Sequence, residues 1–287
     1  MVILEVKSIS YGYSHGTPFE ITALDNVSFS VNKGELVGII GHTGSGKSTL
    51  IKMLNSLLKP EKGQILLHGK DINSDKASIK EARSKVGLCF QYPEYQLFEE
   101  TCAKDIAFGP KNMGLSKAEV NERVIKAARF VGFDEALLQK SPFDLSGGQK
   151  RRCAIAGVMA MFPEVLILDE PTAGLDPAGR ADLMKMIEDY RAATGATVMI
   201  VSHSMDDIAR IADKILVMNK GALAMQGSVR DVFSRADELI SMGLSVPLAS
   251  SIMSTLGKSL DKIPTDVFTV EEAADALFEF YKGREKQ

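Results

Sequence analysis

The sequence predicts an α/β protein whose core is a doubly wound, mostly parallel sheet. Short apolar runs bounded by polar residues recur along the chain, as buried parallel strands do, and stretches with helical periodicity lie between them. This alternation predicts helices packed on both faces of one sheet. The expected core strands are Glu35–Ile40, Lys85–Phe90, Val165–Leu168, Thr197–Val201 and Lys214–Met218.

Two earlier runs predict an N-terminal antiparallel β subdomain. Val2–Lys7 and Ala23–Val31 are apolar or alternate in polarity, and the turn-rich segment YGYSHGTPFE separates them. The strand Glu35–Ile40 then leads into a glycine- and serine-rich loop and a helical stretch from Lys47 to about Leu57. The core is therefore expected to begin as strand, loop and helix.

Helical patterns dominate two further regions. An insert at about residues 94–162 is expected to form a helical subdomain, in which Ser116–Val131 predicts an amphipathic helix capped by Ser116 and Glu119. Strand signals stop after about Gly227. We therefore expect residues 1–230 to form one domain and residues 231–287 to form a small C-terminal helical extension.

The extension contains a second amphipathic helix. Thr269 and Glu272 form a capping-box pattern, and apolar residues follow at helical spacing. These residues are Val270, Ala273, Ala274, Leu277, Phe278 and Tyr281. Such a stripe needs a partner surface, which is either the chain's own domain or a second subunit.

Composition excludes several classes of protein. The 287 residues are 45% hydrophobic and 25% charged, which is typical of a folded globular protein. The 34 basic and 37 acidic residues leave a net charge of −3, so no basic footprint for nucleic acid is present. Cys89, Cys102 and Cys153 lack metal-ligand spacing, which indicates reduced thiols in a cytosolic protein. Without an export signal or a long apolar window, membrane contact is expected only through partner proteins.

A glycine-rich motif lies between the strand Glu35–Ile40 and the helix that follows it. The motif fits G-x-x-x-x-G-K-[ST] and comprises Gly41, His42, Thr43, Gly44, Ser45, Gly46, Lys47, Ser48 and Thr49. Its glycines let backbone N–H groups converge on phosphates, and the helix start adds a positive dipole end. Lys47 would reach the β- and γ-phosphates, and the Ser48 hydroxyl suits Mg²⁺. The strand–loop–helix context favours a nucleoside triphosphate site over a glycine-rich turn that binds nothing.

Two carboxylates follow the apolar strand Val165–Leu168. Ligands bind at the carboxyl ends of strands in open α/β sheets, which is where Asp169 and Glu170 are expected. Asp169 is suited to hold Mg²⁺ through its water shell, and Glu170 could orient or deprotonate an attacking water. An acidic pair after a strand also occurs as a helix cap or exposed turn, but the preceding phosphate motif favours the catalytic interpretation.

A second small-residue helix start occurs at Leu145-Ser146-Gly147-Gly148-Gln149, and its N–H groups could bind another phosphate. This motif matches the LSGGQ signature of ATP-binding-cassette (ABC) ATPases, and the chain resembles that family over about residues 1–230. The resemblance implies a P-loop NTPase core that acts as a nucleotide-binding domain, with ATP and Mg²⁺ bound. It also implies that Ser146, Gly147, Gly148 and Gln149 bind the ATP held by the P-loop of a second ATPase subunit.

The resemblance assigns roles to four other residues. Gln91 resembles the glutamine that contacts Mg²⁺ and the attacking water, and Asp176 closes a D-loop-like segment at the ATP site. His203 resembles the switch histidine that contacts the γ-phosphate, although a lone histidine is often a satisfied surface or core residue. Tyr13 resembles the aromatic residue that stacks on adenine, but Tyr11 is close enough to compete, and strand packing is the other interpretation.

A narrower resemblance is to energy-coupling factor (ECF) transporter ATPases of the A-prime type. It rests on Phe90–Thr101, Asp105–Pro110, Gly16–Glu20 and the C-terminal extension. It implies an ATPase at the cytoplasmic face of the cell membrane that energises uptake of vitamins or transition-metal ions. The implied partners are a second ATPase subunit in a homodimer or heterodimer, a transmembrane coupling protein and a substrate-capture membrane protein. The extension would help to pair the ATPases.

The same resemblance predicts where the coupling protein docks. Apolar and aromatic side chains follow Gln91, and they would either line a groove for the coupling protein or pack locally within the helical insert. They are Tyr92, Pro93, Tyr95, Leu97 and Phe98.

Other ABC functions are less compatible with the sequence. A chromosome-maintenance ATPase usually places a long coiled coil between its phosphate sites, and the segment between Lys47 and Ser146 has no room for one. A translation-associated ABC protein would ordinarily carry two cassettes, whereas each motif occurs once here. The nearest alternative is an ATPase of an ordinary ABC importer or exporter.

Overall fold

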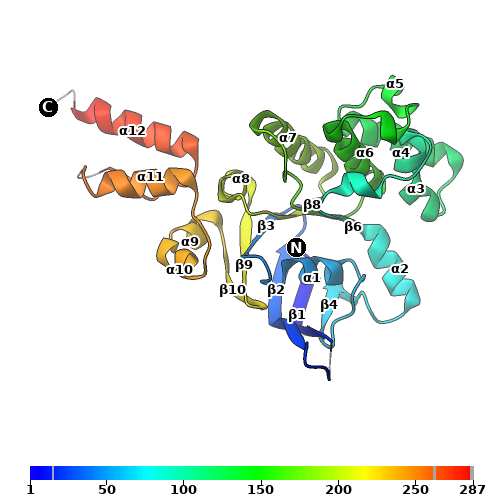
Figure 1. Cartoon of the computed structure of the whole chain (residues 1–287), viewed down its shortest axis with the longest axis horizontal. Coiled ribbons are helices and arrows are strands. Elements are labelled where there is room, and N and C mark those ends of the chain that lie inside the picture. The colour runs from blue at the N-terminus through cyan, green and yellow to red at the C-terminus, as the bar shows by residue number, and fades with distance from the viewer. Residues whose placement is uncertain (15, 261–262, 285–287) are drawn as a thin grey trace.

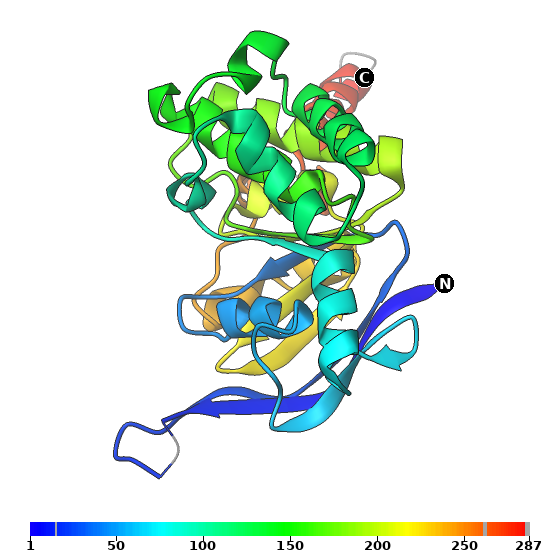
Figure 2. The same ribbon diagram turned by 90° about the vertical axis from the view of Figure 1, so that its right-hand side faces the viewer.

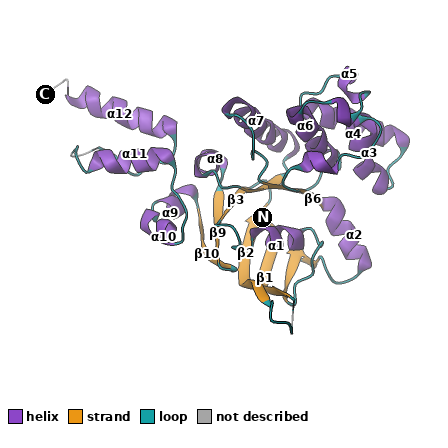
Figure 3. Ribbon diagram, in the orientation of Figure 1, coloured by secondary structure: helices purple, strands orange, loops and turns teal. Residues whose placement is uncertain are grey.

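The computed structural model describes residues 1–14, 16–260 and 263–284, which form two sheets with helices around them (Figure 1 and Figure 3). The strands are β1 (Val2–Tyr13), β2 (Ile21–Asn32), β3 (Leu36–Ile40), β4 (Lys62–Leu67), β5 (Lys70–Asp71), β6 (Val86–Cys89), β7 (Val165–Asp169), β8 (Thr197–Val201), β9 (Lys214–Asn219) and β10 (Ala222–Gly227). The α-helices are α1 (Lys47–Leu54), α2 (Lys76–Lys85), α3 (Cys102–Asn112), α4 (Lys117–Phe130), α5 (Glu135–Leu138), α6 (Gly147–Met159), α7 (Pro177–Thr194), α8 (Met205–Ile211), α9 (Val229–Phe233), α10 (Ala236–Ser241), α11 (Leu248–Gly257) and α12 (Val270–Arg284). The 3₁₀ helices are η1 (Pro93–Gln96) and η2 (Pro142–Asp144).

The larger sheet is the predicted α/β core. Its order is β10-β9-β3-β8-β7-β6, in which β10 alone pairs antiparallel, as an edge strand. Alternate residues of a strand enter different cores: Leu36 and Ile40 face one cluster, whereas Val37 and Ile39 face the other. β3, β7 and β8 are buried at every position, which explains why they are apolar runs without alternation.

The two faces of this sheet are covered differently. Helices α3, α4, α6, α7 and α8 contribute to the first core, whereas α1, α2 and the antiparallel sheet contribute to the second (Figure 1). Helices therefore pack on both faces as expected, and the antiparallel sheet joins them on the second face. In Figure 2, β1 and β2 run as a long ribbon along the side of the molecule opposite the helical group.

The antiparallel sheet has the order β2-β1-β4-β5, and only its first two strands were predicted. β4 escaped prediction because its first three residues are exposed and polar or glycine, which leaves the apolar signal too short. Helix α1 ends at Leu54 rather than near Leu57. The reason is local: Ser56 takes a left-handed conformation (φ 54°), and the N–H of Leu57 donates back to the carbonyl of Lys52 at 2.8 Å.

The predicted helix caps are confirmed. Ser116 and Glu119 form a reciprocal capping box at the start of α4. At α12, the N–H of Glu272 donates to the Thr269 hydroxyl at 3.2 Å, and the N–H of Thr269 donates to the Glu272 carboxylate at 3.4 Å. Each pattern fixes its helix start because it satisfies N–H groups that the helix itself leaves unpaired.

The predicted apolar stripe of α12 divides between two surfaces. Ala273 and Leu277 pack with Met253 of α11, so part of the stripe has a partner within the extension. The remaining stripe residues are exposed: Val270, Ala274, Phe278 and Tyr281. The α11–α12 pair projects from the sheets in Figure 1, and Phe268 anchors it by entering the first core.

No helix in the described parts of the chain has both the length and the apolarity needed to span a lipid bilayer.

Candidate functional site

A cleft of about 510 Å³ opens where the strands of the parallel sheet end. Loops after β3, β6, β7 and β8 meet there, and the end of the β1–β2 ribbon forms one wall. The lining residues are Tyr13, Ile21, Thr22, Ala23, Thr43, Gly44, Ser45, Gly46, Lys47, Ser48, Thr49, Gln91, Asp169, Glu170, Val201 and His203. Most of the predicted site residues therefore share one cleft, whereas Gly41, His42, the signature residues and Asp176 do not line it.

The glycines of the P-loop are required by the loop itself. A Cβ on Gly41 would lie 2.4 Å from the carbonyl oxygen of Met218, and one on Gly46 would lie 2.5 Å from that of Ala23. Gly46 also has a left-handed φ of 101°, which other residues adopt only with strain. Among the described residues no side chain caps the start of α1, so its first N–H groups stay available for an anion.

Lys47 lies on the floor of this loop. It is only 7% exposed, and its Nζ donates to the carbonyl oxygens of Gly41 at 2.5 Å and His42 at 3.1 Å. Burial lowers the pKa of Lys47, while the nearby Glu170 and Asp169 oppose that effect. The buried cation therefore faces two carboxylates across the cleft, and an added anion would be strongly attracted to it.

Two polar groups of the loop fit a phosphate and its metal ion. The Ser45 hydroxyl is buried and has no hydrogen-bond partner in the described chain, so a ligand in the loop would satisfy it. Ser48, Gln91 and Asp169 present hydroxyl, amide and carboxylate oxygens to the cleft, which are the hard donors that Mg²⁺ prefers. Burial raises the pKa of Asp169, and a divalent cation would favour its ionised form.

Glu170 adopts a backbone conformation that turns it out of the line of β7. Its φ is 49°, in the left-handed region, and its N–H donates to the carbonyl of Val201 at 2.9 Å. Burial raises the pKa of Glu170 to about 7, helped by Asp169. At neutral pH this carboxyl is therefore poised to exchange a proton, which suits a group that handles the attacking water.

His203 meets Glu170 at the top of the cleft. The backbone N–H of His203 donates to Oε2 of Glu170 at 3.3 Å, and its ring Nε2 lies 3.2 Å from Oε1 without forming a hydrogen bond. Burial lowers the pKa of His203, with a further contribution from Lys47. A raised pKa on the acid and a lowered pKa on the base both disfavour an ion pair and favour the neutral imidazole. The His203 side chain is half exposed and lines the cleft.

Tyr13 rather than Tyr11 lines the cleft. The Tyr13 hydroxyl lies 3.2 Å from the hydroxyl of Thr49, while Tyr11 is partly buried against the second core. The two rings pack edge to face with centroids 5.0 Å apart, so Tyr11 helps to fix the orientation of the Tyr13 ring. Adenine stacking by Tyr13 stays a prediction.

The signature residues begin α6 on a different part of the surface. Ser146 and Gln149 form a reciprocal capping box, so the Gln149 side chain is turned back toward the helix start. Gly147 and Gly148 are exposed, and a Cβ on either would meet nothing within 4 Å. The folded chain therefore has no need of its own for glycine at these two positions. Phosphate binding by these residues stays a prediction.

Asp176 also lies outside the cleft. Its carboxylate caps α7 by accepting the N–H of Gly179 at 2.7 Å. Its predicted place at an ATP site stays a prediction.

Sequence reasoning missed one buried charged residue near the site. Arg151 lies on α6, is 5% exposed and forms a bidentate pair with Glu94. The sequence contains only a weak indication of this pair. Glu94 lies close to the predicted site residue Gln91, but no local pattern connects Glu94 with Arg151, which lies far along the chain.

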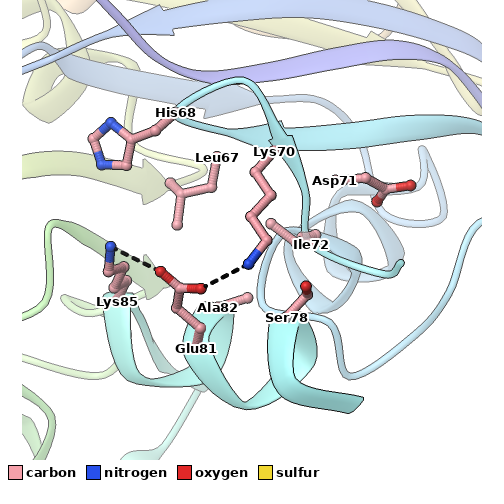
Figure 4. A pocket seen from close by; sticks show the side chains of 9 residues that line it. All are labelled: Leu67, His68, Lys70, Asp71, Ile72, Ser78, Glu81, Ala82 and Lys85. Carbon is pink, nitrogen blue, oxygen red and sulfur yellow. Dashed lines mark hydrogen bonds and ion pairs between the residues drawn. The ribbon is translucent and has the colours of Figure 1, made fainter. Parts of the chain in front are cut away.

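A smaller hollow of about 190 Å³ beside α2 contains basic residues but does not compete as a phosphate site (Figure 4). Lys70 pairs there with Glu81 at 3.2 Å, and Lys85 pairs with Glu81 at 3.1 Å and with Glu164 at 3.3 Å, so both lysines already have carboxylate partners. The cleft at the strand ends is therefore the better anion site.

Comparison with known proteins identifies the family. The model of the family described as ABC transporter matches residues 24–173, which is just over half of the chain. The chain belongs to the ABC transporter family. The predicted fold class, a P-loop NTPase core with an antiparallel β subdomain and a helical subdomain, agrees with its structural neighbours.

Curated relatives and solved structures refine this assignment to the ABC family. The energy-coupling factor transporter ATP-binding protein EcfA2 of Caldanaerobacter subterraneus is 54% identical over 98% of each chain, and EcfA2 of Clostridium tetani is 49% identical over 98% of each chain. The solved structure of CbiO1 from Clostridium perfringens, part of the ABC transporter complex CbiONQ, is 39% identical with a TM-score of 0.74, covering 84% of this chain and 94% of that one. The ABC cassette MJ0796, solved as a dimer with ADP and phosphate, is 26% identical with a TM-score of 0.71, covering 79% and 99%. The resemblance to ECF transporter ATPases is confirmed.

Proposed function

We propose that this ABC protein binds ATP with Mg²⁺ in the cleft and hydrolyses it when a second ATPase subunit closes over the nucleotide. In this proposal, hydrolysis energises an ECF importer for vitamins or transition-metal ions at the cytoplasmic face of the membrane. The observation that carries the proposal is the meeting of Lys47, Glu170 and His203 in one cleft, lined by P-loop glycines that the fold itself requires.

Each residue of the cleft has a task that follows from its surroundings. The N–H groups at the start of α1 and the Lys47 amine would bind the phosphates, with Tyr13 beside the base. Ser48, Gln91 and Asp169 would hold Mg²⁺, which neutralises phosphate charge when bound. Glu170 would accept a proton from the attacking water or orient it, and the neutral His203 would donate a hydrogen bond to the γ-phosphate.

A second subunit would complete the site. Residues 1–230 would act as the nucleotide-binding domain, and Ser146, Gly147 and Gly148 would contact the γ-phosphate held by the partner. Exposed glycines without an intrachain reason support this arrangement, because they leave room for close approach by another molecule. The dimeric structure of MJ0796 supports pairing with a second ATPase subunit, and the exposed half of the α12 stripe would contribute to pairing.

A groove of about 760 Å³ between α2 and α3 is the proposed dock for the transmembrane coupling protein. Phe108 of α3 lines it and meets Phe98 edge to face at 5.0 Å, which connects the groove to the aromatic residues after Gln91. Of those residues, Tyr95 is 85% exposed and Phe98 is 57% exposed, whereas Pro93 and Leu97 are buried. The exposed aromatics are therefore available to a coupling protein, whereas Pro93 and Leu97 pack locally. Because Leu97 is buried, the substitution Leu97→Asp would place a charge in the protein interior. It would therefore test folding and not docking of the coupling protein.

The test of the proposed function is Glu170→Gln in the complex isolated with its membrane partners. Glutamine keeps the shape of the side chain but cannot accept the proton, so ATP affinity should stay within about twofold while turnover falls at least about 100-fold. ATP binding and phosphate release measure the two quantities. Wild-type turnover in this variant would contradict the assignment.

Identifying the co-purified subunits would separate an ECF importer from an ordinary ABC importer or exporter.

A further inference from the structure

Arg151 connects three segments that belong to different parts of the proposed site. Its Nε and Nη2 donate to the two carboxylate oxygens of Glu94 at 3.1 and 2.8 Å. Its Nη1 donates to the carbonyl oxygens of Ala173 at 2.5 Å and Pro171 at 3.4 Å. The side chains of Arg151 and Glu94 are only 6% and 17% exposed, so this is a buried ion pair with added backbone contacts.

The three segments carry the predicted catalytic and signature residues. Arg151 lies in the first turns of α6, just after the signature, and Glu94 lies on η1, just after Gln91. Pro171 and Ala173 follow Glu170 directly, and the N–H of Ala173 donates back to the Glu170 carbonyl at 3.1 Å. One planar guanidinium therefore fixes the signature helix, the Gln91 loop and the Glu170 turn relative to one another.

The same side chain lies directly beneath the exposed aromatic surface. The guanidinium carbon of Arg151 is 5.8 Å from the centroid of the Tyr92 ring, which is 42% exposed. The Tyr92 and Tyr95 rings are 6.2 Å apart, and Tyr95 is almost fully exposed. A protein that contacts these rings is thus separated from the guanidinium by a single aromatic layer.

We propose that Arg151 is a positioning residue that keeps Gln91 and Glu170 in register with the signature helix and transmits contact at Tyr92 to ATP turnover. The inference rests on the proposed function and adds to it the route between the partner surface and the site. A guanidinium can hold Glu94 and two carbonyls at once because its donors form a rigid fork, whereas a lysine amine cannot reproduce that geometry.

Stability and positioning can be separated experimentally. Arg151→Met leaves Glu94 buried without its partner, which destabilises the fold, but replacing both residues by methionine removes the unpaired charge. If Arg151 only stabilises the fold, the double variant should regain both stability and ATP turnover. If Arg151 positions the site, the double variant should regain stability but not turnover.

The experiment measures Tm, and kcat and KM for ATP, in the complex purified with its membrane partners. Arg151→Met should lower Tm and lower kcat at least about tenfold, with KM changed by less than about threefold, because misplaced catalytic groups slow turnover more than they weaken binding. The double variant Arg151→Met/Glu94→Met should recover most of the Tm and none of the kcat. Arg151→Lys should give an intermediate kcat.

Arg191 provides a control near the amino ends of β3 and β9, whereas the cleft lies at the carboxyl ends of the strands. It pairs with Asp213 at 2.5 Å and donates to the carbonyl of Gly34 at 2.8 Å, so Arg191→Met removes the same kinds of contact from a more exposed pair, whose side chains are 28% and 48% exposed. It should lower Tm and leave kcat unchanged. Recovery of kcat together with Tm in the double variant, or wild-type kcat in Arg151→Met, would overturn the inference. A wild-type complex that does not hydrolyse ATP would instead overturn the proposed function itself.

Discussion

The P-loop and the signature motif are both glycine-containing helix starts, but the folded chain uses their glycines differently. Before and at the start of α1, a Cβ on Gly41 or Gly46 would collide with backbone carbonyls, so the loop keeps this conformation only with glycine at both positions. At the start of α6, a Cβ on Gly147 or Gly148 would meet nothing within 4 Å. Glycine lowers helix stability, so a helix start that keeps two unneeded glycines points to a requirement outside the chain. This contrast supports the proposal that the signature motif contacts a second molecule.

Gly41→Ala should have the largest effect on stability. The added Cβ would lie 2.4 Å from the Met218 carbonyl, and overpacking of this kind typically costs about 1–3 kcal/mol. The loop would have to move to accept it, so ATP affinity should fall as well. Chemical denaturation and ATP titration measure the two effects. An alanine variant with unchanged stability would show that the loop is more adaptable than its contacts indicate.

Glu170→Gln should change stability in a pH-dependent way. Burial raises the pKa of Glu170 from an ordinary 4.5 to about 7, so the folded chain keeps this carboxyl protonated at pH values where the unfolded chain loses the proton. Protonation therefore stabilises the wild type fully below the unfolded pKa, and this stabilisation is lost as the pH rises through the folded pKa. Since glutamine does not ionise, the Tm of the variant relative to wild type should increase between about pH 5 and pH 8. A constant difference over that range would contradict the raised pKa.

Gly147→Ala should have the smallest effect on stability, and it should stabilise the chain, whereas Gly41→Ala should destabilise it. Alanine favours the helix and meets no neighbour, so the isolated chain should gain up to about 1 kcal/mol. A thermal melt of the isolated chain measures this. Destabilisation would mean that the chain itself requires glycine here, which would remove the contrast with the P-loop.

Local patterns allowed much of the fold and the site to be predicted. The P-loop, the acidic pair after β7 and the two capping boxes each depend on residues a few positions apart, and their short-range chemistry determines the structure. Features set by distant contacts could not be predicted. Arg151 and Glu94 meet only because η1 packs on α6, and the α12 stripe divides because α11 covers one side of it.

The most direct test of the two-chain site is Gly147→Glu, measured both in the isolated chain and in the assembled complex. Because this position lies outside the cleft, ATP affinity of the isolated chain should equal that of wild type. In the complex, the added carboxylate would repel the γ-phosphate held by the partner, so at least half of the ATP turnover should be lost. Full turnover in the complex, or an equal loss of ATP affinity in the isolated chain, would contradict a site shared between two subunits.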